Sequence, residues 1–128
     1  MAGIVIRQAH FPDRAPVDAY GDGGFRFAGM SHRGAILALP SGIHGWSPVS
    51  VADLDREAFA PVVAQAASFG FFLLGTGEKF AVLPPDLLWY LKGAGLRVEM
   101  MSTGAAVRTY NVMLSEERPV AAGFLPVF

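Results

Sequence analysis

The sequence predicts an α/β fold, because strand patterns fill its first half and strands alternate with helices in its second half. Its 128 residues suit a single domain over residues 1–128, long enough to bury about two-thirds of the surface that the unfolded chain exposes. The succession of strand, helix, strand, helix and strand after residue 70 is typical of βαβ crossovers. We therefore expect parallel strands in the second half and a hairpin in the first.

The first half contains this hairpin and a third strand. Residues 17–20 and 25–27 alternate apolar and polar side chains around the turn 21–24, whose Gly and Asp residues tolerate positive φ. Residues 35–39 form the third strand, and residues 43–46 continue the extended path after a Pro-Ser-Gly turn. Between the hairpin and the third strand, Ser31 is interpreted as a turn residue.

Helical periodicity begins near residue 59. One helix face is predicted from apolar residues at i, i+3, i+4, i+7 and i+10, namely Phe59, Val62, Val63, Ala66 and Phe69. Acidic residues precede this helix, where negative charge suits an N-terminus. Pro61 is expected in its first turn.

Five further elements complete the alternation. Residues 71–74 are continuously apolar, which predicts a central strand with parallel neighbours. Pro84 and Pro85 open a helix that runs to about Lys92 and ends at a following glycine. Residues 96–101 then form a strand, residues 104–115 a helix and residues 120–127 a last strand.

Composition narrows the function classes. Zero cysteines exclude disulfides, thiolate catalysis and cysteine-ligated metal sites. Ten basic against eleven acidic residues give a formal net charge of −1, which provides no electrostatic attraction to nucleic acid. Hydrophobic residues make up 52% of the chain and charged residues only 16%, so apolar side chains remain for a protein partner or a homo-oligomer.

The sequence also predicts that the chain does not insert into a membrane. No run approaches the ~18 apolar residues that a membrane span requires. Residues 1–7 have no basic segment ahead of their short apolar stretch, which predicts that there is no signal peptide. We therefore expect a cytoplasmic protein.

Two short turns give the strongest indication of where a ligand or partner would bind. Gly75, Thr76 and Gly77 follow the apolar strand 71–74, and Ser102, Thr103 and Gly104 follow the strand 96–101. A right-handed crossover would make these strands parallel and bring both turns to one edge of the sheet. In open α/β sheets such an edge lines the crevice in which ligands or partners dock.

Arg108 is the only charged residue between Gly104 and Leu114, in a helix that is otherwise apolar almost all round. In a structural role, Arg108 would be buried against a carboxylate, while Tyr110 and Asn111 satisfy buried backbone groups. In a functional role, Arg108 would face a ligand or partner beside the N-terminus of this helix. Ser102 or Thr103 can cap that N-terminus, and its free N–H groups favour an anion or a carboxylate.

Motifs for catalysis, metal binding or cofactor binding are incomplete. Gly70 and Gly75 have the spacing of a phosphate-binding loop, but Thr76 stands where that loop requires lysine. The three histidines, His10, His32 and His44, have no metal-binding spacing, and His44 beside Trp46 suggests a packed aromatic corner. No serine has a base at the spacing of a known motif. We therefore predict no catalytic residue, no metal and no cofactor.

Several ordered blocks resemble one small protein family. These blocks are residues 18–27, 32–34, 39–42, 44–46, 74–77, 101–106 and 108–111, and together they look like the Mth-domain family of undetermined biochemical function. The resemblance implies an α/β domain with a mixed central sheet, flanking helices and a small additional β layer. Because that family includes an assembly factor of mitochondrial complex I, it also implies protein partners such as membrane-complex subunits or other assembly factors. A bacterial, stand-alone protein is expected.

Two function classes remain open. The first is a non-catalytic interaction or assembly module, and the second is a small-anion-binding protein or an enzyme that uses the same crevice, with Arg108 stabilising negative charge. The enzyme hypothesis is weaker because it has no credible base or nucleophile. The candidate ligand- or partner-binding residues are Gly75, Thr76, Gly77, Ser102, Thr103, Gly104, Arg108, Tyr110, Asn111, His44 and Trp46.

Overall fold

A mixed six-stranded β-sheet forms the centre of the protein in a computed structural model that describes residues 5–6 and 10–128. Its strands are β2 (His10–Phe11), β6 (Ala35–Leu39), β7 (Gly42–Trp46), β8 (Phe71–Gly75), β9 (Val98–Met101) and β10 (Val120–Phe124). They are ordered β2-β7-β6-β10-β8-β9 across the sheet, and β10, β8 and β9 run parallel. The predicted central position of the 71–74 strand, with a parallel neighbour on each side, is confirmed.

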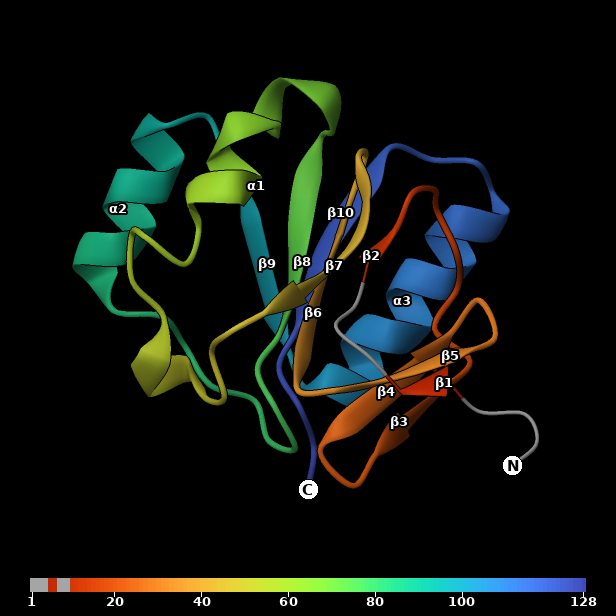
Figure 1. The fold of residues 1–128 in the computed structure, drawn as a ribbon. Coiled ribbons are helices and arrows are strands. Elements are labelled where there is room, and N and C mark those ends of the chain that lie inside the picture. Colours follow the sequence, from red (N-terminus) through yellow and green to blue (C-terminus); the bar gives the residue numbers. More distant parts are fainter. Residues whose placement is uncertain (1–4, 7–9) are drawn as a thin grey trace.

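Helices cover both faces of this sheet (Figure 1). They are α1 (Ala60–Ala64), α2 (Pro85–Gly93) and α3 (Thr103–Ser115), with 3₁₀ turns at Val51–Asp53 and Ala66–Ser68. The helices α1 and α2 lie on one face, and α3 lies on the other together with a second, smaller sheet (Figure 1). The predicted α/β class with a mixed central sheet and an additional β layer is confirmed.

Alternation along the central strands builds a separate core on each face. In β6, Ile36 and Ala38 join the core under α3, whereas Leu37 and Leu39 join the core under α1 and α2. The same alternation holds in β8 and β10. Both faces of the sheet are therefore buried, as expected for parallel strands covered by helices.

The predicted helix over residues 59–69 is shorter than its periodicity indicates. Only Ala60–Ala64 is α-helical, with Pro61 in the first turn as expected. The N–H of Gln65 bonds to the carbonyls of Val62 and Val63, and a 3₁₀ turn at Ala66–Ser68 follows. The apolar residues still face the core, because a tightened helix end keeps nearly the same face buried.

The smaller sheet consists of β1 (Val5–Ile6), β3 (Ala19–Gly21), β4 (Gly24–Phe27) and β5 (Met30–Arg33), in the order β1-β5-β4-β3. The predicted hairpin is confirmed, with Asp22 and Gly23 at φ values of 51° and 80° in its two-residue turn. A second two-residue turn, Ala28-Gly29, joins β4 to β5 with φ values of 50° and 73°. Ser31 is therefore a strand residue, and its interpretation as a turn residue was wrong.

None of the helices in the described residues is long and apolar enough to cross a membrane. The prediction that residues 1–7 contain no signal peptide falls largely outside the described residues and is not tested. The cytoplasmic location also stays a prediction.

Candidate functional site

The two predicted turns lie side by side at one edge of the central sheet. Because β8, β9 and β10 are parallel, their C-terminal ends meet there. The N–H of Thr76 donates to the carbonyl of Met101 (2.8 Å), and the N–H of Thr103 donates to the carbonyl of Gly77 (2.8 Å). The predicted meeting of both glycine turns at one edge is confirmed.

Thr103 joins these turns to the chain that follows β10. Its side chain is fully buried, its Oγ1 donates to the carbonyl of Leu125 (2.7 Å), and it accepts from the N–H of Gly77 (2.9 Å). The N–H of Leu125 in turn bonds to the carbonyl of Gly75 (2.9 Å). Thr103 therefore occupies the space between three strand ends instead of facing solvent.

Thr76 has a similar internal role. Its side chain is only 7% exposed, and its Oγ1 contacts the carbonyls of Lys79 (2.7 Å) and Met101 (3.2 Å). The same oxygen accepts from the N–H of Ala81 (3.1 Å). These bonds hold the loop after β8 against the end of β9, so both threonine hydroxyls of the predicted crevice are engaged by the chain itself.

The N-terminus of α3 is partly capped from within the molecule. Ser102 is the N-cap residue and its Oγ accepts from the N–H of Ala105 over a long 3.4 Å. Gly104, one turn before Arg108, lies beside the small sheet. A Cβ atom added there would stand 2.5 Å from the hydroxyl of Tyr20 and 3.6 Å from Nη1 of Arg108. Tyr20 and Arg108 thus flank the same glycine.

Arg108 is exposed, so of the two roles that the sequence left open for it, the structural one, in which it is buried against a carboxylate, is wrong. Within the described part of the chain the only ion pair joins Arg118 to Glu116 (3.7 Å). The other face of α3 carries its buried residues, among them Val107 and Tyr110. The apolar sequence therefore indicated a helix buried all round, whereas α3 leaves one stripe open that includes Arg108 and Val112. We call Tyr20, Gly104 and Arg108 the arginine rim.

Tyr110 and Asn111 satisfy buried backbone groups, as predicted. The hydroxyl of Tyr110 donates to the carbonyl of Ala15 (2.9 Å), and burial raises the pKa of Tyr110 to about 12. The side-chain amide of Asn111 pairs with both backbone groups of Val17, accepting from its N–H (2.9 Å) and donating to its carbonyl (2.8 Å). These bonds fix the segment before β3 on α3, and so position Tyr20.

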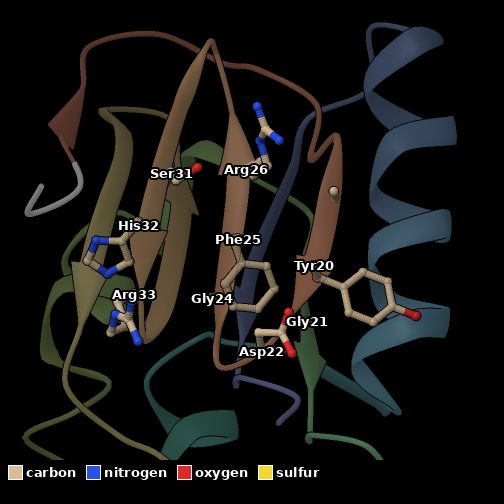
Figure 2. A pocket seen from close by; sticks show the side chains of 10 residues that line it. Tyr20, Gly21, Asp22, Gly24, Phe25, Arg26, Ser31, His32 and Arg33 are labelled. Carbon is tan, nitrogen blue, oxygen red and sulfur yellow. The ribbon is translucent and has the colours of Figure 1, made fainter. Parts of the chain in front are cut away.

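A hollow of about 290 Å³ lies over the small sheet next to the rim, and Tyr20 belongs to its lining (Figure 2). Strand register places Ala19, Arg26 and Ser31 in one row and Gly21, Gly24 and Arg33 in another, with the row of Tyr20, Phe25 and His32 between them. Small residues form the floor on the β3 side. Figure 2 shows Arg26 and Arg33 at opposite ends of the hollow, with the carboxylate of Asp22 also in its lining. This site was not predicted from the sequence, because no strand was expected at β5.

His44 and Trp46 pack against different neighbours and do not form the predicted aromatic corner. The ring of His44 lies beside His10 on β2, with centroids 5.4 Å apart, whereas Trp46 packs edge-on against Phe59. Trp46 is only 8% exposed, and its Nε1 donates to the carbonyl of Ala58 (2.9 Å). Among the described residues no group of three or more His, Asp or Glu side chains is placed to hold a metal ion.

The structure also brings together a serine and a histidine whose spacing in the sequence matches no known motif. Ser41 Oγ lies 2.7 Å from His44 Nε2, and the same oxygen accepts from the side-chain amide of Gln65 (2.9 Å). Burial and the neighbouring His10 lower the pKa of His44, which favours the neutral ring, and its Nε2 shares a hydrogen bond with the Ser41 hydroxyl. Because Gln65 ends α1, this network fastens the β6–β7 turn to that helix.

Replacing His10 by alanine should raise the pKa of His44. The substitution removes the charge repulsion from the neighbouring ring and opens one side of His44 to water, and both changes favour the protonated imidazole. An NMR titration of the imidazole resonances measures this shift. A His44 pKa that stays the same or falls in the variant would show that the two rings do not interact in solution.

A family model described as a protein of unknown function (DUF498/DUF598) matches residues 17–125, which include the arginine rim, the hollow and both glycine turns. The chain belongs to the DUF498/DUF598 family. An uncharacterised relative from Rhodobacter capsulatus is 37% identical over 94% of this chain and 92% of its own length. Mouse NADH dehydrogenase (ubiquinone) 1 alpha subcomplex assembly factor 3 is 28% identical over 96% of this chain, which spans 66% of that protein.

Solved structures of similar proteins have the same fold. A crystal structure described as an outer membrane protein from Bartonella henselae matches with a TM-score of 0.87 and 46% identity. The match covers 93% of this chain and 100% of that one. A Mth938-like domain from Bordetella pertussis has a TM-score of 0.74 and 27% identity, with 94% and 92% coverage. The resemblance to the Mth-domain family is therefore confirmed.

Proposed function

We propose that this DUF498/DUF598 chain is a non-catalytic assembly module that binds a protein subunit of a respiratory membrane complex. The observation that carries this proposal is the similarity of almost the whole chain to a NADH dehydrogenase assembly factor, at 28% identity over 123 residues. The matched region includes the arginine rim and the strands β3, β4 and β5 of the small sheet beside it. An assembly-type role suits a chain whose sequence contains no complete catalytic motif.

The arginine rim is the contact that we propose for this partner. Tyr20 is 41% exposed and Arg108 is also exposed, and these two residue types are enriched among the residues that dominate binding energy at interfaces. Arg26 and Arg33 extend the positive charge into the neighbouring hollow, where Asp22 is the only acidic residue among the described residues of the lining. We propose that the partner presents carboxylates to these guanidinium groups, which bind carboxylates in a bidentate manner.

The other candidate residues support this surface from behind. Thr76, Thr103 and Tyr110 are buried and bond to backbone groups, and Asn111 holds the segment that leads into β3. In the proposed function they position Tyr20 and Arg108 instead of touching the partner. The Gly75 and Gly77 turn serves in the same way, because its N–H and carbonyl groups bond to Thr103 and to the chain after β10.

Replacing Arg108 by alanine should abolish recovery of the partner while leaving the melting temperature nearly unchanged, since the side chain is exposed and has no ion pair among the described residues. The measurement is affinity purification of the tagged chain from its native host, with mass spectrometry of the captured proteins. NADH dehydrogenase subunits or their assembly intermediates are the expected partners of the unmodified chain.

Arg118→Ala is the matched control, because Arg118 is an exposed arginine just beyond the far end of α3. Recovery of respiratory subunits by the Arg108→Ala variant would place the contact elsewhere. Capture of no respiratory subunit by the unmodified chain would contradict the assembly role itself. A turnover lost in Arg108→Ala would instead support the alternative of an anion-binding enzyme at the same surface.

A further inference from the structure

The strand β9 forms an open edge of the central sheet. It pairs with β8 on one side, and no other described strand pairs with it. The carbonyls of Arg97 and Met101 accept from N–H groups of the β8 chain, each at 2.8 Å. Because alternate residues of a strand point to opposite neighbours, the backbone groups of Val98 and Met100 point to the free edge.

The charged residues along this edge are complementary to the same residues in a second copy of the chain. Arg97 and Glu99 are both exposed, and they lie on the same face of the strand because they are two residues apart. Val98 and Met100 face the opposite side, toward the core under α2. If a second β9 is laid antiparallel with Val98 opposite Val98, Arg97 of each copy stands opposite Glu99 of the other. One register thus creates two identical ion pairs.

The same register satisfies the backbone. It places the outward N–H and carbonyl of Val98 against the same groups of the second copy, as a hydrogen-bonded antiparallel pair requires. Arg97 and Glu99 then occupy the flanking non-hydrogen-bonded positions, where facing side chains come closest. A contact that uses one patch on both subunits is isologous, and it closes after two copies.

We infer that two copies of this chain associate through β9, in an antiparallel pairing centred on Val98, to form one continuous sheet. A short strand pair buries little surface, so a stable dimer needs further apolar contact. The helix α2 beside β9 provides it. Trp89 is 72% exposed, and a groove of about 630 Å³ runs between α2 and β9, lined by Leu88, Lys92, Gly95, Leu96, Arg97 and Val98.

Charge reversal tests this pairing. Arg97→Glu sets two carboxylates against each other at both junctions, and Glu99→Arg sets two guanidinium groups against each other there. For each variant alone, the dissociation constant of the dimer should be about tenfold higher than for the unmodified chain, because like charges directly opposite each other are destabilising. An equimolar mixture of the two variants should recover the dimer, since the facing charges are then opposite in sign at both junctions. Analytical ultracentrifugation over a concentration series measures each dissociation constant.

The mixture separates the proposal from a general effect of surface charge. Arg118→Glu is the matched control, because it changes the net charge as much as Arg97→Glu does, at an exposed site outside β9, and should leave the dimer intact. Trp89→Ala should weaken the dimer without altering the folded monomer.

Charged residues on an open edge can also serve to prevent pairing altogether. A monomeric unmodified chain, or a mixture no more dimeric than its separate components, would overturn the inference.

Discussion

Replacing Asn111 by aspartate should lower the free energy of unfolding by about 3 kcal/mol at neutral pH, because it leaves the Val17 carbonyl without a donor and sets a charge against it. The asparagine amide donates to that carbonyl and accepts from the N–H of the same residue. Aspartate keeps the acceptor but replaces the donor by an oxygen. The segment before β3 would then be held by one bond instead of two.

The loss should depend on pH. A protonated aspartic acid can donate to the Val17 carbonyl, so the folded variant favours the protonated form and the pKa of residue 111 rises above its unfolded value. The folded state then binds more protons than the unfolded state, and stability falls as pH rises above about 4, the unfolded pKa. Below that pH the variant should approach the stability of the unmodified chain.

Urea unfolding at pH 7 and at about pH 4 measures this difference, with the unmodified chain followed at both values. Gln65→Glu is the matched control, because the Gln65 amide donates to the oxygen of a hydroxyl, that of Ser41. In the variant this hydroxyl can rotate and donate to the new carboxylate. That control should lose less than about 1 kcal/mol. An equal loss in Asn111→Asp at both pH values would show that the Val17 carbonyl does not depend on this donor.

Local patterns explain why much of the fold could be predicted. The Asp22-Gly23 turn carries the residue pair that a two-residue hairpin prefers, and the apolar run before Gly75 indicates a central strand. The β4–β5 hairpin was missed because its turn is Ala28-Gly29, and alanine at φ 50° is not a common turn residue. The residue type at position 28 therefore gives no local sign of the turn.

The candidate site shows the same division. The two glycine turns were found because crossovers force parallel strand ends to one edge. The role of Arg108 was left open, because its exposure depends on which stripe of α3 faces the sheets. The contacts of Ser41 with Gln65 and of Tyr20 with the Gly104 region join residues far apart in sequence. Neither has a fixed spacing that a sequence could reveal.

Replacing Thr103 by valine should destabilise the fold by about 3 kcal/mol, although the two side chains have nearly the same shape. The substitution removes the hydroxyl that donates to the Leu125 carbonyl and accepts from the Gly77 N–H. Thr103 is fully buried, so water cannot replace either bond without a rearrangement. Two backbone groups at the meeting point of β8, β9 and β10 would be left without their partners.

Thr109→Val is the matched control for this prediction. Thr109 also lies on α3, but its hydroxyl donates to the carbonyl of Ala105 one turn earlier, which remains part of the helix ladder without it. We expect a change within about 0.5 kcal/mol for this control. Denaturant unfolding compares the free energies of unfolding of the two variants, with the same dependence on denaturant concentration (m value) used for both. If Thr103→Val unfolds at the same denaturant concentration as Thr109→Val, then the buried hydroxyl does not tie the three strand ends together. In that case Thr103 would not hold Tyr20 and Arg108 of the arginine rim in position, as we propose that it does.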